Sequence, residues 1–284
     1  MLVPTENEML EAVKAALAED VGPGDATSEA TLPESLRDTA QMVVREPMTL
    51  AGQRLAELAF KHVDSSVDVL AMKADGDRLE CGALIMSISG PTRALLTAER
   101  VALNFVQRLS GVATATARFV EAVKHTKAKI LDTRKTTPGW RRLEKYAVAC
   151  GGGMNHRIGL FDLVMIKDNH LAALRDAEPN AVAAAVARSR EKFPELKVEV
   201  EADHLGQVEQ AVAAGADIIL LDNMSLDELR AAVSLVDGRA QTEASGGVTL
   251  DTVSAIAETG VDFVSVGAIT HSVRAVDIGL DFAN

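Results

Sequence analysis

Short β-rich runs alternate with helical patterns through the second half of the chain. Six such runs lie at residues 129–133, 163–167, 197–201, 217–222, 240–246 and 262–267. Between most of them, apolar residues recur at helical spacing, at 179–193, 205–214, 226–236 and 250–259. Strand–helix alternation implies parallel strands joined by right-handed crossovers. The pattern therefore predicts a β/α barrel or a doubly wound sheet.

The first hundred residues show a mixed pattern instead. Thr5 and Glu8 form a capping box in front of apolar residues at helical spacing. Strand-like runs follow at 41–45, 67–72 and 84–89. Helical spacing returns from residue 95 to about residue 123, and we expect a break in that helix near Ser110-Gly111. A mixed α/β region thus precedes the alternating one.

Each run in the second half ends in polar residues or glycine. The ends are Thr133-Arg134-Lys135, Lys167-Asp168-Asn169-His170, Glu201, Asp222-Asn223, Ser245-Gly246-Gly247 and Gly267-Ala268. In a β/α barrel the carboxyl ends of all strands meet at one face, where catalysis takes place. A doubly wound sheet would spread the same residues along a line. The pattern therefore favours a barrel with one polar mouth.

The composition is that of an ordinary globular chain, with 48% apolar residues among 284. No apolar run approaches the roughly 20 residues of a membrane span. The first residues lack the basic and apolar regions of a signal peptide. The two cysteines, Cys81 and Cys150, are too few for a disulfide framework or a dedicated zinc site. We therefore expect a cytoplasmic protein with no membrane partner.

The formal net charge of −12 argues against nucleic acid as a partner, because nucleic-acid-binding proteins need a basic face. Any site for an anionic ligand must therefore concentrate positive charge locally. Four elements could supply that charge. They are Arg134-Lys135, His156-Arg157, Lys167 and Arg100. Arginine grips carboxylates with paired hydrogen bonds and lysine adds a compact charge, so the set predicts an anion site.

Two acidic positions accompany the cations. In Lys197-Val198-Glu199-Val200-Glu201, strand alternation places both glutamates on one face, which would be the barrel interior. Asp222 follows an apolar strand. Glu201 and Asp222 could hold Mg²⁺ or sugar hydroxyls. Alternatively they could pair with Lys135 and Lys167 in a structural ion network, and the two roles can coexist.

Glycine-rich turns follow the last two runs. They are Ala244-Ser245-Gly246-Gly247-Val248 and Val266-Gly267-Ala268-Ile269-Thr270-His271. Glycine turns after late barrel strands commonly hold a phosphate through backbone N–H groups. Together these features predict a barrel enzyme whose ligands are a phosphorylated sugar and a small anion.

Several motifs, in order and spacing, resemble the quinolinate phosphoribosyltransferase family. They lie at 19–28, 99–104, 107–114, 132–139, 151–160, 166–170, 198–201, 220–223, 244–248 and 266–272. The resemblance covers roughly residues 9 to 280. It implies a decarboxylating pentosyltransferase that joins quinolinate to phosphoribosyl pyrophosphate with Mg²⁺. The products would be nicotinate mononucleotide, CO₂ and pyrophosphate, in NAD synthesis.

The resemblance also implies an architecture. It predicts an incomplete parallel β/α barrel at residues 113–272 and an N-terminal α/β sandwich-like domain at residues 1–112. Residues from about 273 to 284 would complete the N-terminal domain. The family forms homodimers in which Arg100 would reach the partner's site. Further assembly of the dimers stays open.

The resemblance assigns roles to single residues. Arg100, Thr133, Arg134, Lys135, His156, Arg157 and Lys167 would bind quinolinate and pyrophosphate. Glu201 and Asp222 would meet the ribose and its metal. The catalytic set would be Lys135, Lys167, Glu201 and Asp222. The 5′-phosphate would be bound by Ser245, Gly246, Gly247, Val266, Gly267, Ala268 and His271.

Three other interpretations remain at this point. A related phosphoribosyltransferase-like protein of molybdenum transport operons would share the fold but not the ligand. A non-catalytic binding protein on the same scaffold would have lost a charged site residue, and none is lost here. A Schiff-base aldolase would use Lys135 or Lys167 as its nucleophile.

Overall fold

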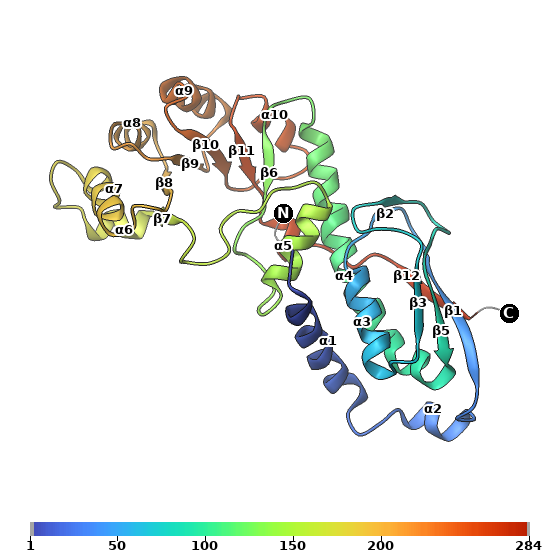
Figure 1. Ribbon diagram of the computed structural model, residues 1–284. Coiled ribbons are helices and arrows are strands. Elements are labelled where there is room, and N and C mark those ends of the chain that lie inside the picture. The colour runs from blue at the N-terminus through green and yellow to red at the C-terminus, as the bar shows by residue number, and fades with distance from the viewer. Residues whose placement is uncertain (1–2, 283–284) are drawn as a thin grey trace. The chain divides into compact units, whose positions relative to one another are not determined.

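The computed structural model describes residues 3–282, which form two compact units (Figure 1). The described part of the first unit comprises residues 3–117, 137–152 and 272–282. The second unit comprises residues 118–136 and 153–271. Within residues 3–282, no helix combines the length and the apolar character that crossing a membrane requires.

The first unit is built on a four-stranded antiparallel sheet with the order β12-β1-β5-β3. Its strand β12 comes from the end of the chain and pairs with β1, so distant segments share one sheet. The elements are α1 (Glu6–Val21), α2 (Ala26–Thr31), β1 (Arg37–Val44), β2 (Met48–Thr49), α3 (Gln53–Val63), β3 (Asp68–Ala71), β4 (Arg78–Leu79), β5 (Leu84–Pro91), most of α4 (Thr92–Val123), α5 (Arg141–Cys150) and β12 (Ile278–Phe282).

The three strands and the capping box predicted for this region are confirmed. Thr5 accepts a hydrogen bond from the Glu8 backbone N–H, and the Glu8 carboxylate accepts one from the Thr5 backbone in return. This exchange satisfies two of the N–H groups that a helix start leaves unpaired. The sequence therefore determines where α1 begins.

The helix break expected near Ser110-Gly111 is wrong, because α4 is one continuous helix. Ser110 is fully buried, and its hydroxyl bonds both the N–H and the C=O of Ala51. A Cβ built on Gly111 would lie 2.2 Å from the Arg274 carbonyl oxygen. The two small residues therefore allow close packing inside the first unit and do not end the helix.

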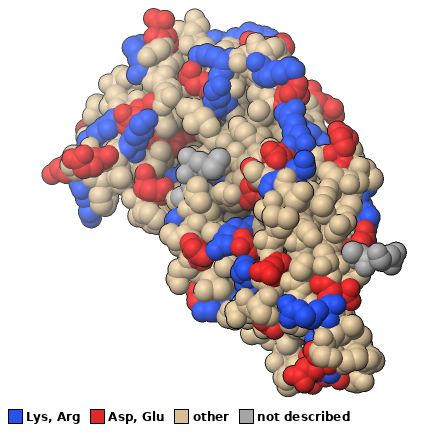
Figure 2. Space-filling view, turned by 45° about the vertical axis from the view of Figure 1, so that its right-hand side comes forward, with Lys and Arg blue, Asp and Glu red and all other residues tan. Residues whose placement is uncertain are grey.

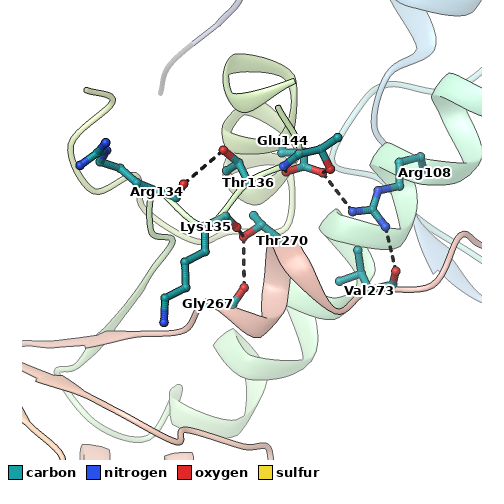
Figure 3. A network of polar contacts seen from close by, with 9 residues as sticks. Arg108, Arg134, Lys135, Thr136, Glu144, Gly267, Thr270 and Val273 are labelled. Carbon is teal, nitrogen blue, oxygen red and sulfur yellow. Dashed lines mark hydrogen bonds and ion pairs between the residues drawn. The ribbon is translucent and has the colours of Figure 1, made fainter. Parts of the chain in front are cut away.

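Residues 137–152, which the predicted domain bounds assign to the barrel, lie in the first unit instead. Arg108 Nη2 lies 3.0 Å from Oε1 of the fully buried Glu144 and also donates to the Val273 carbonyl (Figure 3). The rings of Phe105 and Trp140 stack with centroids 5.0 Å apart. A buried ion pair and an aromatic stack thus bind α5 to α4.

The second unit contains a six-stranded, all-parallel sheet with the order β6-β11-β10-β9-β8-β7. Helices α7, α8 and α9 lie along its outer side (Figure 1). Its elements are β6 (Lys129–Leu131), β7 (Val164–Ile166), α6 (Asp168–Ala173), α7 (Ala181–Lys192), β8 (Val198–Ala202), α8 (Leu205–Ala213), β9 (Ile218–Asp222), α9 (Leu226–Val236), β10 (Gln241–Ser245), α10 (Val253–Ala257), β11 (Phe263–Ser265) and α11 (Ala268–His271).

The six predicted parallel strands and the incomplete barrel are confirmed. Strands β6 and β7 are the two edges of the sheet, and no ladder among the described residues joins them. The apolar residues of the strands are buried, Val198, Val200 and Ile219 completely. Parallel strands covered on both faces read as apolar runs, which is why the sequence pattern located them.

The packing at Gly111 generates a prediction. We expect Gly111→Ala to lower the free energy of unfolding by about 1–3 kcal/mol, because the new methyl group would overlap the Arg274 carbonyl. Urea denaturation of the two purified proteins would measure the change.

Gly206→Ala in α8 is the matched control. A Cβ there would meet only the tip of the His204 ring, at 3.3 Å. Because alanine is the better helix former, we expect this variant to gain up to about 1 kcal/mol. Equal stability of Gly111→Ala and the wild type would contradict the packing explanation.

Candidate functional site

A cavity of about 710 Å³ opens in the second unit at the carboxyl ends of the parallel strands. Its volume is in the range of small-molecule sites. Fourteen predicted site residues line it. They are Thr133, Arg134, Lys135, His156, Arg157, Lys167, Glu201, Asp222, Ser245, Gly246, Gly247, Gly267, Ala268 and His271. The parallel topology thus brings the predicted strand ends to one mouth.

The basic segment after β6 is held by its backbone. The Thr270 hydroxyl donates to the Lys135 carbonyl at 2.7 Å, and the Lys135 N–H donates to the Thr133 hydroxyl at 3.0 Å. Figure 3 shows the Arg134 and Lys135 side chains extending away from these backbone contacts. Because the backbone is fixed, the two cations are held at the cavity that they line.

Asp132, just before this segment, connects it to the next loop. Its carboxylate is fully buried and accepts 2.8 Å bonds from the Asn155 amide and the His156 backbone N–H. A parallel bridge between Leu131 and Met154 continues the same contact. One buried carboxylate therefore positions both the Arg134-Lys135 segment and the His156-Arg157 pair.

The acidic positions lie on neighbouring strands. Glu201 on β8 forms an ion pair with Lys167, and Asp222 at the end of β9 accepts a bond from the Asn223 amide. Both carboxylates line the cavity. Of the ion network predicted for Glu201 and Asp222 with Lys135 and Lys167, the structure shows the pair of Lys167 with Glu201. Since that pair lies at the cavity wall, it leaves a ligand-binding role open to both residues.

The turn after β10 requires glycine. Gly246 and Gly247 have φ values of +100° and +59°. A Cβ on Gly246 would lie 2.1 Å from the amide oxygen of Asn223, the residue after β9. The turns that follow β9 and β10 are therefore in contact, and the positive φ values make any larger residue at either glycine strained. Such a turn can present N–H groups to an anion.

A buried cluster of three groups lies at the base of the cavity. His156 Nε2 is 3.1 Å from Glu199 Oε2 and 3.5 Å from Glu243 Oε2. The side chains of Glu199, Glu243 and His156 are 0%, 1% and 8% exposed. Burial, followed by the charge of Glu199, raises the pKa of Glu243 to about 7. Two close, buried carboxylates resist ionising together.

Glu243 is a residue that sequence reasoning missed. It lies on the same strand face as Ser245, two positions away on β10. The signal in the sequence was a charged residue inside a β-rich run. It lies two positions before Ser245, a predicted site residue, and therefore on the same face of the strand.

Two predicted residues do not line the cavity. Val266 is 1% exposed, so its side chain belongs to the core. Arg100 is exposed on α4 in the first unit, and its predicted role depends on a partner subunit. Cys150 also lies in the first unit, and burial raises the pKa of its thiol to about 12. A thiol with so high a pKa is a poor nucleophile, in keeping with a packing role.

The cavity therefore combines a cationic wall, two carboxylates and a glycine turn. On the face drawn in Figure 2, acidic and basic side chains are interspersed, without a broad basic surface. Positive charge is thus concentrated locally within an acidic chain. This arrangement can neutralise a small polyanion while carboxylates face developing positive charge.

The raised pKa of Glu243 predicts a pH-dependent stability. Unfolding restores the ordinary value of 4.5, so between pH 4.5 and about 7 the unfolded chain releases a proton that the folded protein keeps. Stability contributed by this group is therefore full below pH 4.5 and is lost as pH rises to about 7. The facing groups are Glu199, His156, Ser265 and Lys167.

We expect Glu243→Gln to remove this loss. Relative to the wild type, the variant should become more stable by about 1–3 kcal/mol between pH 5 and pH 8. Urea denaturation at both pH values would measure the difference. If the difference in free energy of unfolding between the variant and the wild type is the same at pH 5 and pH 8, Glu243 does not hold a proton in the folded protein.

Family models match nearly the whole chain. The model described as "Quinolinate phosphoribosyl transferase, N-terminal domain" matches residues 25–110, and the one described as the C-terminal domain matches residues 112–281. A Mycobacterium leprae protein named nicotinate-nucleotide pyrophosphorylase [carboxylating] is 47% identical, with 95% of each chain covered. A Bacillus subtilis protein named as a probable enzyme of this kind is 43% identical over 93% of this chain and 89% of its own.

Solved structures agree with these matches. NadC from Streptococcus pyogenes superposes with a TM-score of 0.94 at 41% identity and covers all of both chains. The nicotinate-nucleotide pyrophosphorylase from Francisella tularensis gives 0.93 at 40% identity and covers 99% and 98% of the two chains. A human nicotinic acid phosphoribosyltransferase, at 13% identity and a TM-score of 0.59, shares the fold.

Proposed function

Because the chain belongs to the quinolinate phosphoribosyltransferase family, we propose that it transfers phosphoribosyl from phosphoribosyl pyrophosphate to quinolinate. The products are nicotinate mononucleotide, CO₂ and pyrophosphate. The observation that carries the proposal is the single cavity that gathers Arg134, Lys135 and Lys167 with Glu201 and Asp222. The substrates are both polyanions, and the reaction develops positive charge at the sugar.

The cations bind and orient the anionic groups. Arg134, Arg157 and the lysines of the wall neutralise the two quinolinate carboxylates and the departing pyrophosphate. Burial and the nearby Arg134 lower the pKa of Arg157 below its ordinary value, while Glu199 opposes that shift. The cationic side of the cavity thus keeps several positive charges close together. Binding of a dianion reduces the repulsion between these charges.

The carboxylates act on the sugar. As the bond from ribose C1 to pyrophosphate breaks, Glu201 and Asp222 stabilise the positive charge at C1, and the pyridine nitrogen forms the new bond there. The resulting pyridinium withdraws electrons from the adjacent ring carbon. CO₂ leaves, its bonding electron pair stays on that carbon, and a solvent proton then joins it.

Mg²⁺ suits the oxygen donors of this site. Glu201 and Asp222 end neighbouring strands and both reach the cavity, so their carboxylates could share a cation with phosphate oxygens. When bound, the ion supplies charge neutralisation for the pyrophosphate. Glu201 would share its carboxylate between that ion and Lys167.

The phosphate site follows from the glycine turns. Backbone N–H groups at Ser245–Gly247 and at Gly267 and Ala268, with His271, would bind the 5′-phosphate. The N–H of Val266 donates to the Leu131 carbonyl instead. A Cβ on Gly267 would lie 3.1 Å from His271 Nε2 and 3.2 Å from Lys135 Cδ, so the imidazole and the lysine approach the same turn. This places a neutralising group beside the backbone donors.

Assembly completes the proposal. We place the protein in the cytoplasm as a homodimer in which Arg100, exposed on its helix, reaches the partner's cavity. An exposed arginine on a helix can deliver a bidentate contact to a carboxylate of a bound substrate.

An assay tests the reaction itself. Purified protein receives quinolinate, phosphoribosyl pyrophosphate and Mg²⁺, and nicotinate mononucleotide and CO₂ are measured, with nicotinate as the alternative substrate. We expect the protein to turn over quinolinate and not nicotinate. Turnover of nicotinate in its place, or of neither acid, would refute the proposal and favour a different ligand for the shared fold.

Variants test the cationic wall. We expect Arg134→Ala and Lys167→Ala each to lower kcat/KM by about 100-fold or more, because each leaves substrate charge unpaired. Arg230→Ala is the control, since Arg230 pairs with Asp227 on the surface, and it should retain full activity. Near-normal turnover and quinolinate affinity in both wall variants would contradict the assignment.

Mixed dimers test Arg100. Arg100→Ala and Lys167→Ala, each nearly inactive alone, are unfolded together and refolded as a mixture. If Arg100 acts in the partner's cavity, half of the dimers contain one intact site, which restores about a quarter of wild-type activity. Absence of any recovery in verified mixed dimers would place Arg100 in its own subunit's site or outside both.

A further inference from the structure

His156 lines the cavity, but both nitrogens of its ring face protein groups. Its Nδ1 accepts a 2.6 Å hydrogen bond from the Arg157 backbone N–H. Its Nε2 faces Glu199 and Glu243 at 3.1 and 3.5 Å. Both ring nitrogens are therefore directed at protein groups, and only 8% of the side chain is exposed.

His156, Glu199 and Glu243 have the residue types and the spacing of a metal site, because their ligand atoms all lie within 4.8 Å of one another. A metal bound by Nε2 needs the lone pair of that nitrogen. Since Nδ1 accepts a hydrogen bond, the ring proton lies on Nε2 and occupies that position. This tautomer directs the Nε2 proton toward the two carboxylates.

The two glutamates have no other clear role. All four of their carboxylate oxygens are buried, and none has a hydrogen bond of good geometry. Buried carboxylates are costly unless they are paired, so their retention needs an explanation. The charges that compensate them are Arg157 for Glu199 and Lys167 for Glu243, while the neutral His156 ring turns its Nε2–H toward both carboxylates. Arg157, Lys167 and His156 each line the cavity.

We propose that His156 is a positioning residue, held by Glu199 and Glu243, which fixes the Arg157 backbone at the cavity wall and does not bind quinolinate through its ring. Strands β8 and β10 each supply one glutamate, so two neighbours of the central strand β9 anchor one loop. The proposal deepens the proposed function, because the group positioned is an arginine that would bind the acid substrate.

The consequence is that quinolinate affinity depends on two carboxylates that act through the ring of His156. We expect His156→Ala and Glu243→Gln each to raise KM for quinolinate by about 10-fold, with little change in KM for phosphoribosyl pyrophosphate. Because both act through the same ring, the double variant should be no worse than His156→Ala. His156→Asn should recover part of the affinity, since its amide oxygen can accept the Arg157 N–H.

The control is Glu258→Gln. Glu258 forms a 3.0 Å pair with His125 in the same unit, but both side chains are exposed. That variant should leave both KM values unchanged. Multiplying effects in the double variant, about 100-fold in all, would show that His156 and Glu243 act independently and would overturn the proposal.

A second measurement does not depend on the variants folding. ¹⁵N resonances of the His156 ring in the wild-type protein should report an unprotonated Nδ1 and a protonated Nε2. Saturating quinolinate should leave both resonances in place. A protonated Nδ1, or a shift of either nitrogen caused by direct contact with the acid, would overturn the proposal. A protein that binds no quinolinate would refute the proposed function, while the tautomer would still test the cluster.

Discussion

Positive charge gathered in one cavity must be held in place before any substrate arrives. Like charges repel, and the remainder of this chain is strongly acidic. Carboxylates of the protein both offset the repulsion between the cations and hold the loops that carry them. Asp132 fixes two loops through a backbone N–H and an amide, and Glu201 holds Lys167 directly. Glu199 is buried beside the ring of His156, and Glu243 lines the cavity itself. The anion site thus depends on anions of the protein itself.

Much of the fold follows from the sequence because its signals are local. The apolar runs located all six parallel strands, and a single exchange between Thr5 and Glu8 marked the start of α1. What failed required knowledge of distant partners. The pair Ser110-Gly111 resembles a helix end until Ala51 and Arg274 are known to press against it. The packing of residues 137–152 with α4 also depends on a distant partner, because Glu144 pairs with Arg108.

In the site, too, local sequence signals predicted some features and not others. The ends of the predicted strands indicated which side chains would line one cavity, because the carboxyl ends of parallel strands meet at one face. Physical reasoning reached an anion and a phosphate, whereas the identity of the acid came from resemblance. Glu243 escaped because alternation was read for β8 but not for β10. Val266 belongs to the motif that resembles the family, but its side chain lies in the core and its N–H donates to the Leu131 carbonyl.

The open seam between β6 and β7 has a consequence for how such a pocket can evolve. In a closed barrel, strand number and stagger together fix the radius. Here the strand that leads to Arg134-Lys135 and the strand that leads to Lys167 are the two edges of the sheet and do not pair with each other. The outer edge of β6 forms an isolated bridge to Met154 instead. No backbone ladder within residues 3–282 sets their separation. Insertions or deletions between these strands could therefore adjust the pocket to a wider or narrower acid while the strand count stays unchanged.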